Sequence, residues 1–321
     1  MKTLVLSMIS IAATVAAMTA CTSESDPIND ITNPKDAKVE IKLNAGVIGV
    51  ETKAAITQDE GISAFNNATV PLFRMDGSAD PTWADVTSTV NATINGTTVT
   101  LGQNQQYYPN EGNAYFIGYY SELTPTTTKN VLAFAEVDGT KDIICTNQTN
   151  AGSKVLPTSN AKLIFNHMLS KVEIKVVGTA ASVAAFGDIT KVELLDMPTS
   201  LDLTLDKTSS IVANADSPKP AIVLHEGTKA IPTTSSETIG VIPMIFNGGE
   251  SSPYGTNANP LKIKVTTSIG GVFDIDVKSI TSGLENGKKH TITLTFKDKI
   301  GVSTEITPWG DSTNSGSEDV G

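Results

Sequence analysis

The sequence predicts an all-β protein built from two tandem β-sandwich domains. Short runs rich in Val, Ile, Thr, Tyr and Phe recur along its 321 residues, separated by Gly, Pro, Asn, Asp and Ser. Within many runs apolar and polar residues alternate, which is the period of a strand with one buried face. No window carries a long helical period. The two cysteines, Cys21 and Cys145, give no disulfide framework, so apolar cores must hold the fold.

The chain begins with the features of an export signal. Lys2 precedes an apolar run from Leu4 to Ala17, which is too short to span a bilayer and is followed by small residues. We therefore predict that residues 1–20 are a signal peptide. Cys21 resembles the cysteine of a bacterial lipobox, which implies that it is acylated and anchors the chain to a membrane. The acidic stretch after it is typical of a tether and resembles signals that send lipoproteins to the outer face of the outer membrane.

The first expected strand lies within residues 37–55, and the prediction for residues 21–53 is a lipidated tether followed by a removable strand. Its alternation puts five apolar side chains on one face: Val39, Ile41, Leu43, Ala45 and Val47. After the strand, Lys53 and Ala54 form a bond that a trypsin-like protease could cut in a polar connection. Such a cut would release a strand and expose an apolar groove. The alternative is an ordinary first strand with an incidental lysine.

Further strands are expected along both halves of the chain. In the first half they cover 70–75, 86–94, 97–101, 114–120, 131–137, 170–177, 191–195 and 201–205. A linker near 212–220 leads to strands at 222–225, 240–246, 261–269, 272–280 and 290–296. We predict domains at residues 54–209 and 210–321, and about one helical turn at 180–186.

Three hairpins are predicted, one from a turn dipeptide and two from the parity of neighbouring strands. Asn95-Gly96 is a strong signal for a two-residue turn. A three-residue turn over 269–271 would pair Val265 with Ile275 and keep the apolar residues of both strands on one face. A turn over 297–299 would pair Phe296 with Ile300 if the last strand folds back on its predecessor.

Composition and motifs argue against several functions. A net charge of -11 disfavours nucleic acid and anionic membrane surfaces as partners. The single arginine, Arg74, speaks against clamps for phosphate or carboxylate. His167, His225 and His290 stand outside any metal or catalytic motif, and Cys145 is expected within a strand. We therefore predict no enzyme activity, no cofactor and no metal site.

Three stretches resemble the fimbrillin family, the Mfa-like and type V pilin subunits that build fimbriae on some outer-membraned bacteria. They are LIFNHMLSKVEIKV at 163–176, Tyr107-Tyr108-Pro109 followed by NAYFIGYY, and the end GLENGKKHTITLTFKDKIGVSTEITPW with Trp309. The resemblance implies a lipoprotein precursor, two transthyretin-like sandwiches and clipping after a basic residue downstream of the first strand. Here the matching bond is Lys53-Ala54, where the family more often has arginine.

The resemblance also implies that a strand from the next subunit fills the groove left by clipping. The donor would be the C-terminal region, where Val302, Thr304 and Ile306 alternate with polar residues. The same segment could instead fold back on the strand at 290–296 as a hairpin. The polar tail from Gly310 to Gly321 is a poor apolar donor.

Two functions remain as hypotheses. The first is a structural subunit of a surface fimbria, exported as a lipoprotein to the outer membrane and supporting adhesion, with other fimbrial subunits and an unknown receptor as partners. The second is a monomeric lipid-anchored protein that binds a glycan or another host ligand. A glycan platform needs exposed aromatic side chains, for which the candidates are Trp83, Trp309 and the tyrosines near Tyr107 and Tyr119.

Overall fold

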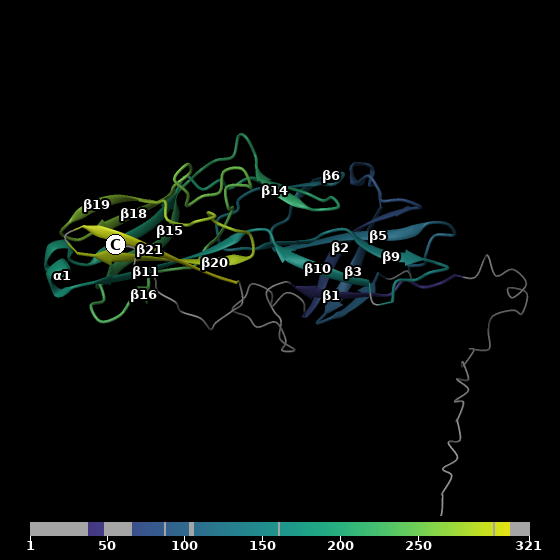
Figure 1. The fold of residues 1–321 in the computed structure, drawn as a ribbon, viewed down its shortest axis with the longest axis horizontal. Helices are drawn as coiled ribbons and strands as arrows, with labels where there is room; N and C mark the ends of the chain where they lie inside the picture. Colours follow the sequence, from purple (N-terminus) through teal and green to yellow (C-terminus); the bar gives the residue numbers. More distant parts are fainter. Residues whose placement is uncertain are drawn as a thin grey trace, which may run out of the picture. The chain divides into compact units, whose positions relative to one another are not determined.

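The computed structural model describes residues 38–47, 66–86, 88–102, 106–159, 161–297 and 299–308 (Figure 1). The predicted signal peptide, Cys21, Lys53 and Ala54 lie outside these residues. The predicted all-β class is confirmed. Within the described residues, helical structure is limited to α1 (Ala180–Phe186) and a 3-10 turn at Trp83–Asp85. The capping box between Thr179 and Ser182 explains where α1 begins.

The largest sheet contains β1 and closes on itself. Its order is β2 (Asn66–Gly77), β3 (Ser88–Asn95), β4 (Thr98–Leu101), β1 (Leu43–Val47), β10 (Ala161–His167), β8 (Ile143–Thr146), β5 (Asn113–Ser121) and β9 (Thr149–Ser153). A further pairing between β2 and β5 closes all of these strands except β9 into a ring. The β1–β10 pair is parallel, whereas β1 runs antiparallel to β4.

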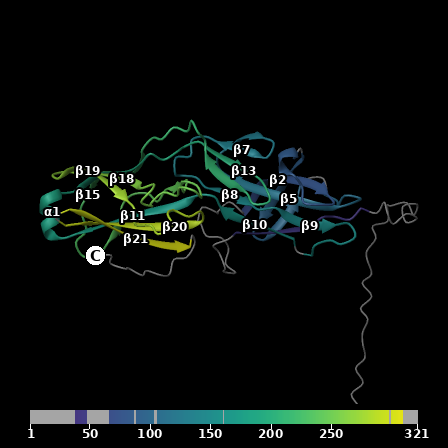
Figure 2. The same cartoon turned by 45° about the horizontal axis from the view of Figure 1, so that its top comes forward.

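A second sheet covers the outer face of part of this ring. It consists of β14 (Ser210–Ala213), β13 (Leu201–Thr204), β7 (Val131–Phe134) and β6 (Thr126–Thr128), with β7 and β13 side by side in Figure 2. Strands β2, β5 and β8 are therefore buried on both faces. Leu72 and Phe116, for example, pack inside the ring with β1, whereas Phe73 and Ile117 pack against β7 and β13.

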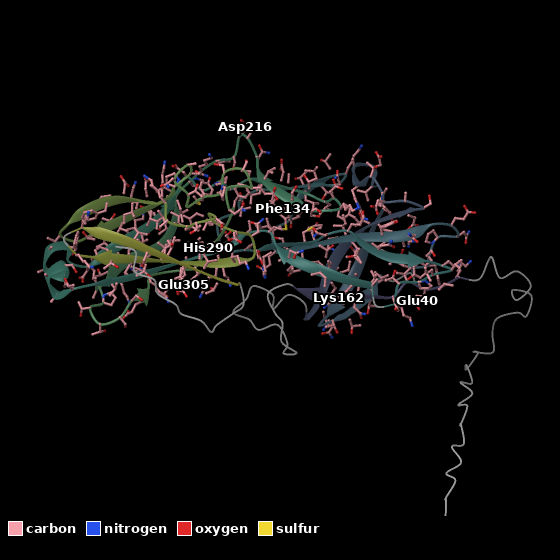
Figure 3. The ribbon with its side chains drawn as sticks, viewed as in Figure 1. Glu40, Phe134, Lys162, Asp216, His290 and Glu305 are labelled. Carbon is pink, nitrogen blue, oxygen red and sulfur yellow. The ribbon has the colours of Figure 1, made fainter. Side chains whose placement is uncertain are left out.

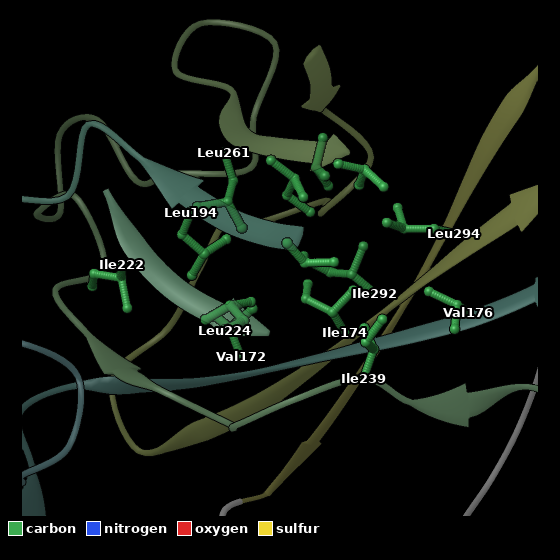
Figure 4. Close-up of a cluster of buried hydrophobic side chains, with 14 of the residues drawn as sticks. Val172, Ile174, Val176, Leu194, Ile222, Leu224, Ile239, Leu261, Ile292 and Leu294 are labelled. Atoms are coloured by element: carbon green, nitrogen blue, oxygen red, sulfur yellow. The ribbon is translucent and has the colours of Figure 1, made fainter. Parts of the chain in front are cut away.

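Two more sheets enclose the third apolar cluster. One contains β16 (Glu237–Thr238), β11 (Ser170–Gly178), β20 (Lys288–Phe296) and β21 (Ile300–Pro308), with β17 (Met244–Ile245) also paired to β11. The other contains β15 (Ile222–Lys229), β12 (Ile189–Leu195), β18 (Leu261–Thr267) and β19 (Gly271–Val277). Figure 4 shows side chains from both sheets meeting, among them Ile174, Leu194 and Ile292. Segments from both sides of residue 209 share these sheets, and a division into two sandwich domains there stays a prediction.

The predicted hairpins form, with two corrections. The β3–β4 turn occupies Gly96 and Thr97, one residue later than predicted, because Asn95 still pairs with Thr98. The β20–β21 hairpin has the predicted register, with Phe296 opposite Ile300.

The β18–β19 turn has the predicted length of three residues, but its predicted position is wrong. It covers 268–270, so Val265 pairs with Phe273 and not with Ile275. The cause is an anchor outside the hairpin. The backbone N–H groups of Ser268 and Ile269 donate to the carbonyls of Asp188 and Phe186, which fixes the turn one residue earlier. The side-chain parity is unchanged, because the register moves by two residues.

Candidate functional site

The candidate functional site is the set of segments that pair with the first strand. We call these segments the seat. Strand β1 pairs along both edges, with β10 from Leu43↔Ala161 to Val47↔Phe165 and with β4 at Leu43↔Val99. The N–H of Ala45 also donates to the carbonyl of Thr97 over 2.9 Å. The first described element of the chain therefore lies in the middle of a sheet and not at its edge.

A third segment, residues 106–108, extends this seat toward the beginning of the chain. Ile41 N–H donates to the carbonyl of Gln106 over 2.8 Å, and Tyr108 N–H donates to the carbonyl of Val39 over 2.9 Å. Glu40 and Tyr107 form the antiparallel bridge between these bonds. We call residues 106–108 the rail. The sequence did not predict this pairing, because Gln-Gln-Tyr-Tyr-Pro has no alternating pattern.

The alternation predicted for the first strand is confirmed in its described part. Ile41, Leu43 and Ala45 are 3%, 4% and 1% exposed and belong to the apolar cluster inside the ring. The intervening Glu40 and Lys42 are exposed. Glu40 and the exposed Lys162 of the neighbouring β10 are labelled in Figure 3. The strand thus buries one face and presents the other to solvent.

The LIFNHMLSKVEIKV segment forms the support of this seat. Leu163 and Phe165 of β10 are fully buried in the same cluster as Leu43. His167 ends β10, and its Nδ1 lies 2.5 Å from Oδ2 of Asp142, with both side chains buried. This position agrees with the predicted structural role of His167. The pair fixes the end of the strand against which β1 lies.

The other two histidines also have structural positions. His225 donates from Nε2 to the carbonyl of Gly227 over 3.0 Å. His290 is fully buried, its Nε2 accepts from the N–H of Glu285 over 3.0 Å, and its Nδ1 has no hydrogen-bond partner in the described part of the chain. Burial lowers the pKa of His290 to about 4, so this imidazole is neutral at pH 7.

The described residues give no support to a catalytic or metal centre. Cys145 lies in β8 as predicted, and burial raises the pKa of its thiol to about 12, so the thiol is protonated at pH 7. No group of three His, Cys, Asp or Glu side chains suitable for a metal ion occurs among the described positions. In the same residues no helix is long and apolar enough to cross a membrane.

Of the aromatic side chains proposed for a glycan platform, Trp83 is buried, whereas Tyr107 and Tyr119 are half-buried. Trp83 is 1% exposed and donates from Nε1 to Oε1 of Gln148 over 2.8 Å. Tyr119 packs edge-on against Phe134, with 6.3 Å between ring centroids. Trp309 lies outside the described residues. The burial of Trp83 removes one of the proposed candidates from the surface.

The C-terminal strand is folded back in this structure. Strand β21 pairs with β20 over nine residues, from Lys288↔Pro308 to Phe296↔Ile300. It is the last strand of its sheet among those described, and Ile306 is 39% exposed. The tail from Gly310 to Gly321 lies outside the described residues.

Comparisons with protein families and with solved structures found similar proteins. A sequence model described as fimbrillin-like matches residues 52–309. No curated protein matches the sequence. A crystallised candidate cell adhesion protein from Bacteroides uniformis has 16% identity and a TM-score of 0.58, over 84% of this chain and 99% of its own. A fimbrial protein from Bacteroides vulgatus has 11% identity and a TM-score of 0.54, over 85% of this chain and 100% of its own. At these identities the structures share the fold.

Proposed function

The chain belongs to the fimbrillin-like family, and on this premise we propose that it is a subunit of a cell-surface fimbria that assembles by strand exchange. In this proposal β1 leaves its seat after proteolysis, and a strand from a neighbouring subunit takes its place. The observation that carries the proposal is the position of β1. It is central in a sheet, yet it is the first described strand, so one cut between β1 and β2 separates it from all the other described strands.

The energetics of the seat favour replacement over an empty groove. Burial of Ile41 and Leu43 stabilises the ring by about 1.5–3 kcal/mol for each side chain. Each main-chain bond to β10, β4 and the rail adds about 1 kcal/mol net. Loss of β1 therefore leaves apolar surface and unpaired backbone groups, and an incoming strand recovers both contributions by β-augmentation.

The proposed route begins with export as a lipoprotein. Residues 1–20 are removed as a signal peptide, Cys21 is acylated, and the chain reaches the surface of the outer membrane. Cleavage between Lys53 and Ala54 then frees the segment that contains β1. The partners are other fimbrial subunits, of this or a related sequence, and the fimbria supports adhesion to a receptor that the chain itself does not identify.

A disulfide that locks β1 in place tests the exchange. Asn44 and Lys162 are paired on adjacent strands with their side chains toward solvent, and paired strand positions suit a disulfide. We expect a chain carrying Asn44→Cys and Lys162→Cys to be processed but to form no heat-sensitive oligomers until it is reduced. The matched control is Lys264→Cys with Asp274→Cys, a cross-strand pair on β18 and β19.

The outcomes separate the two hypotheses. The control disulfide should leave assembly on cells at the parent level, because it lies in a different sheet from β1. Assembly of the oxidised, locked chain at the parent level would overturn strand exchange at β1. A parent chain that remains monomeric on its own cells would favour the lipid-anchored binding protein.

A further inference from the structure

Arg74, the single arginine of the chain, holds the rail from the side opposite β1. Its Nη1 donates to Oε1 of Gln106 over 2.7 Å, and its Nη2 donates to the carbonyl of Tyr107 over 2.8 Å. Nε and Nη2 also form a fork with Asp76 at 2.9 and 3.0 Å. The guanidinium lies 5.8 Å from the centroid of the Phe116 ring, and the side chain is 11% exposed.

Tyr108 fixes the other end of the rail. Its side chain is 6% exposed in the apolar cluster inside the ring, and its hydroxyl donates to the carbonyl of Ala151 over 2.8 Å. Arg74 belongs to β2 and Ala151 to β9. Both anchors thus join the rail to strands other than β1.

The carbonyl of Gln106 and the N–H of Tyr108, both in the rail, face residues 39–41 of the first strand. The rail accepts from Ile41 and donates to Val39, so main-chain bonds join the rail to the residues just before β1. Charge-assisted bonds from a guanidinium are stronger than neutral ones, and a planar fork also fixes orientation. The rail is therefore held by side chains on one side and offers its backbone on the other.

We propose that Arg74 and Tyr108 are positioning residues that keep the rail in place when β1 leaves, so that an incoming strand meets a preformed pairing edge. This inference rests on the proposed strand exchange. Preorganisation strengthens binding, because each backbone residue that must be ordered on association lowers the affinity by roughly tenfold. The residues act on strand acceptance by holding the rail in place.

The test uses the full chain from Cys21, with a site for a sequence-specific protease inserted between Lys53 and Ala54. The nicked protein is incubated with a fluorescent synthetic peptide of residues 38–47, and its affinity is measured by anisotropy. Two modified peptides carry an N-methyl group at Ile41, which removes the bond to Gln106, or at Ala45, which removes the bond to Thr97. Arg74→Lys is the main variant, and Tyr108→Phe is the second.

We expect Arg74→Lys to weaken the binding of the unmodified peptide by about tenfold, the value of one charge-assisted bond network. Methylation at Ile41 should weaken binding to the parent but change little in Arg74→Lys, because the rail is already displaced. Methylation at Ala45 should weaken binding to both proteins by the same factor. Tyr108→Phe should reproduce this pattern if Arg74→Lys fails to fold.

Other results separate the inference from its premise. If Arg74→Lys and Tyr108→Phe weaken the binding of all three peptides by the same factor, these residues are general stabilisers, and the inference is wrong. The same holds if neither variant changes the affinity. If the parent takes up no peptide after nicking, strand exchange itself is wrong and the inference falls with it.

Discussion

The substitution Leu43→Ala should accelerate release of the first strand far more than a substitution of its neighbour. Leu43 is 4% exposed inside the ring, beside Ala161 of β10 and Val99 of β4. Leucine-to-alanine changes in cores cost about 2–5 kcal/mol, because the cavity closes only in part. We take about 2 kcal/mol, the lower bound, which corresponds to roughly thirtyfold weaker binding of the strand. The loss should appear in the dissociation rate, where most affinity changes between related complexes lie.

The assay follows the chain nicked between residues 53 and 54, with a fluorophore on the N-terminal fragment and an excess of unlabelled strand peptide. The decay of anisotropy gives the rate at which β1 leaves. Lys42→Ala is the control, because Lys42 lies on the same strand and is exposed. An exposed substitution changes stability by less than about 0.5 kcal/mol, or roughly twofold in rate. Equal rates for Leu43→Ala and Lys42→Ala would refute the claim that the buried face holds the strand.

Three further predictions concern the rest of the chain. The pKa of His290 is lowered to about 4 by burial, so between pH 6.5 and 4 the unfolded chain binds a proton that the folded chain does not. The free energy of unfolding should therefore fall by up to about 1.4 kcal/mol per pH unit on acidification, and His290→Gln should flatten the urea-denaturation profile in this range. An unchanged slope would contradict this. Gly118→Ala should cost about 1–3 kcal/mol in the same assay, since its new Cβ would lie 2.6 Å from Leu72 Cδ2 in the core. Gly46→Ala should cost little, because its close contacts are with the flexible end of Lys162 and Ile164 Cδ1 lies at an ordinary 3.6 Å. Equal costs would refute the packing argument. In a chain whose only cysteine is Cys145, a thiol reagent should react after denaturation but not before, whereas rapid labelling of the folded protein would contradict its burial.

Local alternation was sufficient to predict most strands and some of their pairings. The parity of Leu294 and Val302 gave the register of the β20–β21 hairpin, because a short turn leaves few alternatives. The β18–β19 hairpin shows the limit of this approach. Its strands have the predicted parity, but the turn moves because it is bound to Phe186 and Asp188, which no local pattern contains.

Long-range contacts account for what the sequence did not predict. The parallel pairing of β1 with β10 joins Leu43 to Ala161, and such a separation leaves no local signal. The role of Arg74 in holding the rail could not be predicted, since its partners at Gln106 and Tyr107 come from a segment without periodicity. The first strand and its buried face were therefore predictable from the sequence. Its pairing with β10, β4 and the rail was not.

The N-terminal sequence and mass of the protein recovered from the surface of its own cells test the central claim most directly, together with gel analysis of unheated samples. The proposed strand exchange predicts a chain that begins at Ala54 and a ladder of heat-sensitive oligomers. An acylated chain that begins at Cys21 and runs as a single monomer band would contradict it.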